Sequence, residues 1–255
     1  MRIGTFNILH GRSLADGAVD LDRFASAVAH LDADVLGLQE VDRDQPRSHG
    51  ADLTDVAAEA MGARDHRFVA ALAGTPGGGW TAATGGELPG SPAYGLALVS
   101  RYPVASWRVI RLPLLRATLP LWSTETNRPF LVRDEPRVAV AAVLDGPYGA
   151  LTACTTHLSF VPGWNAVQLR RLMRALTGSR EPLVLTGDLN MATAQATLLT
   201  RMRSIAAAPT FPAAAPTRQI DHVLARGPIA ALAPAEAPPL PLSDHRALVV
   251  PCGPA

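Results

Sequence analysis

Short apolar runs alternate with amphipathic helical patterns at the start of the chain, and this alternation restricts the fold more than any other feature. The runs Ile3–Ile8 and Asp34–Gln39 are typical of short buried strands. A helical pattern follows each of them, at Asp20–Leu31 and at Ala51–Met61, and Gly62 ends the second. A strand–helix–strand–helix order is typical of an α/β layer architecture.

Beyond residue 65 the predicted strands follow one another with few helices between them. They are Arg67–Leu72, Tyr94–Ser100, Val104–Leu112, Arg137–Leu144, Ala150–Leu158, Pro182–Thr186, Gln219–Ala225 and Arg246–Val250. Helices are predicted at Asn165–Leu176 and Ala194–Met202, a hairpin turn at residues 145–149, and long loops at the Gly- and Pro-rich residues 74–92 and 113–136. We therefore expect one domain over residues 1–255, with mixed sheets packed face to face and helices outside.

Composition excludes several functional classes. The 255 residues are 48% hydrophobic, enough for a substantial core, so a disordered chain is excluded. All 23 basic residues are arginine, which rules out lysine-based catalysis, and the net charge of +1 provides no general attraction to nucleic acid. No apolar run is long enough to span a membrane and no signal peptide is evident, so we expect a cytoplasmic protein. We also expect the protein to be a monomer.

Polar side chains stand where the predicted strands begin or end. The set comprises Asn7, Glu40, His157, Asp188, Asn190, Asp221, Asp244 and His245. Taken singly, these residues have ordinary structural explanations, such as a solvated charge for Glu40, a turn residue for Asn7 and a semi-buried histidine for His157. Ligand sites in sheet proteins gather at strand ends, however, so the set as a whole favours a functional site.

The chemistry of this set predicts hydrolysis of phosphate esters. Carboxylate and amide oxygens are hard ligands that suit Mg²⁺ or Mn²⁺, and no thiolate cluster competes with them. His157 and His245 can hydrogen-bond phosphoryl oxygens or move a proton near neutral pH. Phosphate-ester hydrolysis needs this combination of a Lewis acid, a group that aligns water and donors for developing charge.

The sequence motifs that carry these residues resemble a known superfamily. They are TFN at 5–7, LQEV at 38–41, SRYP at 100–103, THL at 156–158, GDLN at 187–190, IDHV at 220–223 and SDH at 243–245. Their content and order resemble the endonuclease/exonuclease/phosphatase superfamily, which includes deoxyribonucleases, sphingomyelinases and inositol-polyphosphate phosphatases. The resemblance implies a four-layer α/β/β/α sandwich of two mixed β-sheets with the site at one end, and a metal-dependent phosphoric ester hydrolase.

The same resemblance implies the metal-binding part of the site. Glu40 would be the principal carboxylate ligand of Mg²⁺ or Mn²⁺. Asn7 would orient that carboxylate or bind phosphate beside the metal. Asp244 would lie near the metal and contact it through water.

It also implies the groups that act on water and phosphate. Asp188 would align and deprotonate the attacking water, and Asn190 would hold a phosphoryl oxygen. His245, supported by Asp221, would bind or protonate the phosphoryl group. His157 matches the histidine of deoxyribonuclease- and sphingomyelinase-like members.

Three arginines are candidates for binding substrate phosphate. Arg12 and Arg43 follow the first two strands and could hold phosphate bidentately, although solvated loop arginines are an equal alternative. Arg137 begins a strand beside the expected site. We expect a phosphorylated small molecule or lipid head group as substrate, with DNA or RNA as the alternative. A non-catalytic relative that binds a phospho-ligand or a protein is a further alternative, disfavoured because every metal and water-aligning residue is present.

Overall fold

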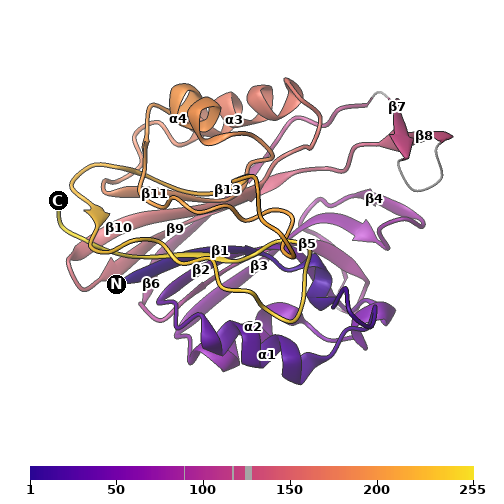
Figure 1. Cartoon of the computed structure of the whole chain (residues 1–255), viewed down its shortest axis with the longest axis horizontal. Coiled ribbons are helices and arrows are strands. Elements are labelled where there is room, and N and C mark those ends of the chain that lie inside the picture. The colour runs from indigo at the N-terminus through magenta and orange to yellow at the C-terminus, as the bar shows by residue number, and fades with distance from the viewer. Residues whose placement is uncertain (89, 117, 124–127) are drawn as a thin grey trace.

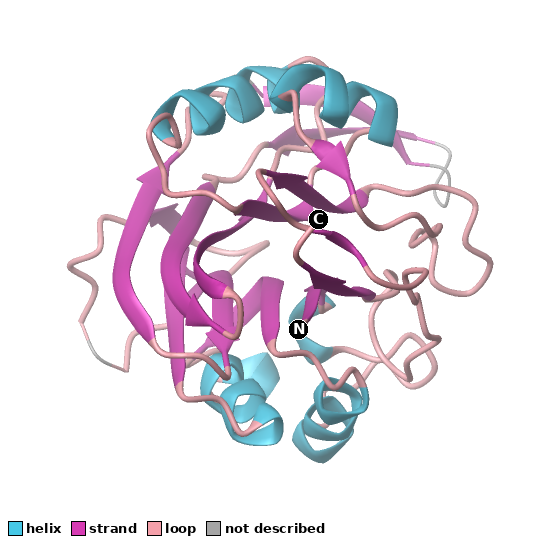
Figure 2. Ribbon diagram, turned by 90° about the vertical axis from the view of Figure 1, so that its left-hand side faces the viewer, coloured by secondary structure: helices cyan, strands magenta, loops and turns pink. Residues whose placement is uncertain are grey.

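Two mixed β-sheets pack face to face, and helices cover both outer faces (Figures 1 and 2). The computed structural model describes residues 1–88, 90–116, 118–123 and 128–255. The first sheet has the order β14-β15-β1-β2-β5-β3-β4 and contains β1 (Arg2–Asn7), β2 (Val35–Arg43), β3 (Asp65–Gly74), β4 (Trp80–Ala82), β5 (Ala93–Ser100), β14 (Ala230–Ala231) and β15 (Leu248–Gly253). Its outer face carries α1 (Leu21–His30) and α2 (Leu53–Met61).

The second sheet has the order β12-β13-β11-β10-β9-β6. It contains β6 (Val104–Arg111), β9 (Val138–Gly146), β10 (Gly149–His157), β11 (Leu183–Asp188), β12 (Arg203–Ser204) and β13 (Asp221–Arg226). Its outer face carries α3 (Trp164–Ala175) and α4 (Thr193–Thr200). The predicted four-layer α/β/β/α sandwich is thereby confirmed, as is the antiparallel hairpin of β9 and β10 around residues 147–148.

Local sequence signals account for the helix boundaries. Asp20 caps α1 because its side chain accepts a hydrogen bond from the Arg23 backbone N–H. Asp52 caps α2 in the same way through the Thr54 N–H, and Gly62 ends α2 with φ +62°, a conformation that glycine adopts without strain. Both helices therefore start and stop within two residues of their predicted limits.

The two sheets are in close contact at Gly37 in the middle of β2. A Cβ atom there would lie 2.3 Å from Thr155 Oγ1 and 2.6 Å from Thr186 Oγ1, both on the opposite sheet. Next to this contact, the buried Gln39 side chain donates to Thr155 Oγ1 at 2.9 Å and accepts from Thr5 Oγ1 at 3.0 Å. A small polar cluster thus joins the sheets within an otherwise apolar interface.

Two predicted loops contain more structure than their sequences indicate. The segment 74–92 includes β4, which pairs with β3, and the segment 113–136 includes the paired strands β7 (Thr118–Ser123) and β8 (Arg128–Arg133). These short strands form because a partner strand supplies hydrogen bonds, which a local pattern does not reveal. Residues 89, 117 and 124–127 of these segments lie outside the described residues. Within the described part of the chain, no helix has the length and apolarity needed to cross a membrane.

Candidate active site

Strand register brings three of the predicted site residues side by side on the second sheet. His157 at the end of β10 pairs with Asp188 at the end of the parallel strand β11. Asp188 in turn pairs with Asp221 at the start of the antiparallel strand β13. Adjacent strands are about 4.8 Å apart, so this register alone places the three side chains at one end of the sandwich.

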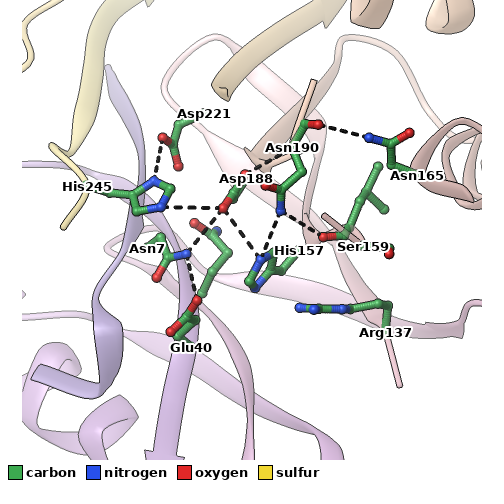
Figure 3. Close-up of polar contacts among 12 residues, drawn as sticks. Asn7, Glu40, Arg137, His157, Ser159, Asn165, Asp188, Asn190, Asp221 and His245 are labelled. Carbon is green, nitrogen blue, oxygen red and sulfur yellow. Dashed lines mark hydrogen bonds and ion pairs between the residues drawn. The ribbon is translucent and has the colours of Figure 1, made fainter. Parts of the chain in front are cut away.

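The first sheet contributes Asn7 and Glu40 to the same place (Figure 3). Asn7 Nδ2 donates to Glu40 Oε1 at 3.0 Å and to Asp188 Oδ2 at 3.2 Å, and so links the two sheets. The predicted end of the second strand at Gln39 is wrong, because β2 continues to Arg43. Glu40 instead lies at a register shift inside β2 with φ +59°, and bulges of this kind redirect a side chain.

Asp188 also contacts both histidines. Its Oδ2 lies 3.5 Å from His157 Nε2 and 3.8 Å from His245 Nε2, and its Oδ1 accepts a hydrogen bond from the Asn190 N–H at 2.9 Å. Asn190 has φ +50°, and its Nδ2 donates to the Leu158 carbonyl oxygen at 3.0 Å. The Asn190 amide therefore lies next to His157, with 3.4 Å between Nδ2 and Nε2.

A buried carboxylate orients His245. His245 Nδ1 lies 2.9 Å from Asp221 Oδ2, and the same oxygen accepts from Thr210 Oγ1 at 2.6 Å. The ring of Phe211 packs against His245 at a centroid distance of 4.9 Å. Thr210 and Phe211 were not predicted, because the segment around them has neither helical nor strand periodicity. Their adjacency to His245 follows only from the tertiary fold.

Burial and neighbouring charges set different protonation states for the central groups. Burial, with the charge of Asp221, raises the pKa of Asp188 to about 7. Burial opposes charge on His245, but the hydrogen bond to Asp221 and the charges of Asp221 and Asp188 raise its pKa to about 9. Burial, with the charges of Arg137 and His245, holds the pKa of His157 well below its usual value. Near neutral pH, Asp188 thus lies between a charged and a neutral imidazole.

The donor set fits a hard divalent cation. Asp188, Asp221 and His245 offer ligand atoms within 4.8 Å of one another, so this cluster could hold a metal ion. Burial raises the pKa of Glu40, and the negative charge of Asp244 adds to that rise. The charge of Asp244 also contributes to the raised pKa of His245. A divalent cation would offset this accumulation of carboxylates, and oxygen donors of this kind suit Mg²⁺ or Mn²⁺.

The three predicted phosphate-binding arginines lie in different surroundings. Arg137 is buried beside the site, its Nη2 lies 3.6 Å from Asp134 Oδ1, and its Nε has no hydrogen-bond partner among the described residues. The guanidinium of Arg43 instead lies over the Phe68 ring at 4.5 Å. Arg12 is exposed, and its backbone carbonyl accepts from the Ser243 N–H. Neither Arg12 nor Arg43 joins the hydrogen bonds around Asp188.

Comparisons with known proteins identify the family and the fold. An endonuclease/exonuclease/phosphatase from Beutenbergia cavernae is 26% identical, with a TM-score of 0.70 over 100% of this chain and 72% of that one. Two more distant proteins share the fold. A mannosyl-6-phosphatase from Bacteroides thetaiotaomicron is 15% identical, with a TM-score of 0.66 over 99% of both chains. Sphingomyelinase C from Streptomyces griseocarneus is 16% identical, with a TM-score of 0.59 over 98% of both chains. A search of curated protein sequences gave no match. The sequence model of the Endonuclease/Exonuclease/phosphatase family matches residues 4–245, and the chain belongs to that family.

Proposed function

We propose that this protein is a divalent-metal-dependent hydrolase of phosphate esters in which water attacks phosphorus in line, without a covalent intermediate. The observation that carries the proposal is the convergence of Asn7, Glu40, His157, Asp188, Asn190, Asp221 and His245 on one end of the sandwich. Membership in a family named for phosphoester-cleaving enzymes supports the same reaction class.

In this proposal Glu40 is the principal metal ligand, and Asp188, Asp221 and His245, although close enough together to share an ion, act on water and phosphate instead. Asn7 holds the Glu40 carboxylate through its 3.0 Å hydrogen bond, and Asp244 contributes negative charge nearby. Mg²⁺ or Mn²⁺, when bound, supplies a Lewis acid that stabilises charge on the phosphoryl or leaving oxygen. Arg137 is buried close enough to His157 for its charge to act on that ring, and it provides a positive charge for a substrate phosphate.

Asp188 positions the attacking water and accepts its proton. A pKa raised to about 7 suits a general base that works near neutral pH. The Asn190 amide and the neutral His157 ring lie next to this carboxylate and hold a phosphoryl oxygen. His245 remains an imidazolium because Asp221 fixes its Nδ1–H, which leaves Nε2–H to donate to the developing negative charge.

We infer a small phosphorylated molecule or a lipid head group as the substrate. The net charge of +1 supplies no general attraction to a polyanion, although hydrolysis of DNA or RNA remains the alternative to test. A non-catalytic relative would lack part of the set of residues that align water. Here Asp188 contacts both Asn190 and His245, so this set is present and the non-catalytic alternative is disfavoured.

A panel of phosphoesters tests the proposed reaction. Plasmid DNA, abasic DNA, sphingomyelin, inositol phosphates, nucleotides and sugar phosphates are incubated with the protein in EDTA, Mg²⁺ or Mn²⁺, and the products are quantified. We expect hydrolysis that EDTA abolishes and that Mg²⁺ or Mn²⁺ restores. Glu40→Gln should lose at least about 10²-fold in activity because it removes the ligand charge, whereas Glu59→Gln, the same change on the exposed face of α2, should not.

Hydrolysis that persists after exhaustive removal of metal would contradict the role of the cation. A wild-type protein that hydrolyses no member of the panel, yet is folded by circular dichroism, would favour the non-catalytic alternative.

A further inference from the structure

A second concave surface lies beside the candidate active site, and the proposed chemistry does not use it. It is a groove of about 500 Å³ lined by Arg43 of β2, Arg67 and Phe68 of β3, Arg111 of β6 and the turn at residues 84–87. We call it the arginine groove. Three guanidinium groups from three separate strands converge there, which creates a concentrated positive surface on a chain of nearly zero net charge.

Few carboxylates neutralise this surface. Arg43 Nε lies 3.9 Å from Asp44 Oδ2, and within the described residues Arg67 and Arg111 form no ion pair. Glu87 lines the groove, but its carboxylate accepts hydrogen bonds from the backbone N–H groups of Thr84 and Gly85. Three arginines against Glu87 and Asp44 leave the groove with an excess of positive charge.

Each of the three guanidinium groups has a neighbour in the groove or beside it. Arg43 lies 4.5 Å above the Phe68 ring, and Arg67 lies 6.0 Å above the Trp107 ring. Arg111 donates to the Ala70 carbonyl oxygen at 3.4 Å. A guanidinium stacked on an aromatic face keeps its N–H groups directed sideways, which is the arrangement that binds a phosphate or carboxylate bidentately.

The groove adjoins the metal and phosphate site along the strands. Arg43 follows Glu40 by three residues in β2, so their Cα atoms lie at most about 11 Å apart. Arg111 pairs with Val138, the residue after Arg137, across the ladder of β6 and β9. One ligand that carries two anionic groups separated by on the order of 10 Å could therefore reach both places.

We propose that the arginine groove binds a second phosphate group of the substrate, so that the preferred substrates are small molecules with two separate phosphates. The proposal rests on the proposed hydrolase function for the first phosphate. The groove recognises the second phosphate through Arg43, Arg67 and Arg111 and does not take part in cleavage.

Binding of inorganic pyrophosphate to metal-free protein tests the groove without any reference to catalysis. Isothermal titration calorimetry in EDTA compares the wild type with the double variant Arg67→Gln/Arg111→Gln. Both arginines are exposed, so the substitutions should leave the fold intact. We expect a loss of affinity of at least about tenfold, since each charge-assisted contact contributes that much. The matched control is Arg108→Gln, which removes a positive charge from the same strand, β6. Because side chains alternate between the two faces of a strand, Arg108 and Arg111 lie on opposite faces, and Arg108 lines a different pocket. Equal affinities in all three proteins, or no binding by the wild type, would overturn the proposal.

A pair of synthetic substrates tests the consequence for specificity. The ratio of kcat/KM for hexane-1,6-diyl bisphosphate to kcat/KM for hexyl phosphate should exceed one in the wild type. It should fall at least about tenfold in the double variant, mainly through KM, and stay unchanged in Arg108→Gln. An unchanged ratio in the double variant would refute the second-phosphate site. If hydrolysis of a single-stranded oligonucleotide depends on these arginines and that of the bisphosphate does not, the small-molecule form of the proposal is wrong.

The two experiments separate this proposal from the function on which it rests. A wild type that binds pyrophosphate through Arg67 and Arg111 but hydrolyses neither alkyl phosphate nor any member of the phosphoester panel would overturn the hydrolase assignment and the substrate preference, and would support the groove as an anion site. A wild type that hydrolyses hexyl phosphate but shows no preference for the bisphosphate would overturn only the second-phosphate site.

Discussion

Asp188 is the residue through which the two sheets and both histidines of the site are connected. It receives a hydrogen bond from Asn7 of the first sheet and one from the Asn190 backbone, and its Oδ2 lies within 4 Å of both His157 and His245. Because burial already raises its pKa to about 7, its environment favours proton acceptance over permanent charge.

We expect Asp188→Asn to lower turnover by at least about 10²-fold while the protein remains folded. The amide retains the size of the carboxylate and can still accept the Asn190 N–H, but it cannot take a proton from water. The measurement is kcat on the best substrate of the panel, with Asp22→Asn in the exposed first turn of α1 as the control. A turnover close to that of the wild type would remove Asp188 from the role of base.

The pair formed by His245 and Asp221 predicts a specific pH dependence of stability. Since the folded-state pKa of His245 is raised to about 9, its protonation stabilises the metal-free protein below pH 6.5, and this contribution is lost as the pH rises through 9. The free energy of unfolding of the wild type minus that of His245→Gln should therefore decrease by roughly 1–3 kcal/mol between pH 6.5 and 9. Urea unfolding in EDTA measures this difference, and a difference that stays constant with pH would contradict the raised pKa.

At the scale of secondary structure, the site depends on how closely the two sheets pack beneath it. Gly37 faces Thr155 and Thr186 of the other sheet, and Gln39 bridges the sheets one residue before Glu40. The bulge at Glu40 therefore begins next to the contact between Gln39 and Thr155. Glu40 has a strained backbone with φ +59°, and this contact keeps its carboxylate in one position.

We expect Gly37→Ala to destabilise the protein by about 1–3 kcal/mol, because the new methyl group would overlap the two threonine hydroxyl groups and push the sheets apart. Gly79→Ala serves as the control, since a Cβ at that position meets no atom within 4 Å. Urea unfolding gives both values. Equal stability of the two variants would show that the interface is looser than the structure indicates.

The sequence predicts elements well where the signal is local and poorly where it depends on pairing. The caps Asp20 and Asp52 and the terminator Gly62 define the helices, and apolar runs define the long strands. Strands β4, β7 and β8 depend on partner strands, and the bulge in β2 depends on a register shift against β5, so no local pattern reveals them.

At the scale of the whole molecule, the order of short motifs predicts both the family and the α/β/β/α layers. The motifs also name the polar residues that meet around Asp188. Their mutual distances follow from strand register, and the support of His245 by Thr210 and Phe211 follows from tertiary packing, neither of which a motif encodes. The position of Arg43 in the arginine groove likewise depends on β3 and β6, which lie far from it in the sequence.

The first and last strands of the chain are neighbours, and the two ends of the ribbon lie close together (Figures 1 and 2). Met1 and Cys252 exchange hydrogen bonds, and Ser243 Oγ donates to the carbonyl oxygen of Asn7 at 2.7 Å. During synthesis Asn7 emerges well before His245, so a nascent polypeptide first holds only an incomplete set of reactive groups. Under the proposed function, the hydrolase becomes competent only when β15 docks beside β1, which ties the onset of catalysis to the completion of folding.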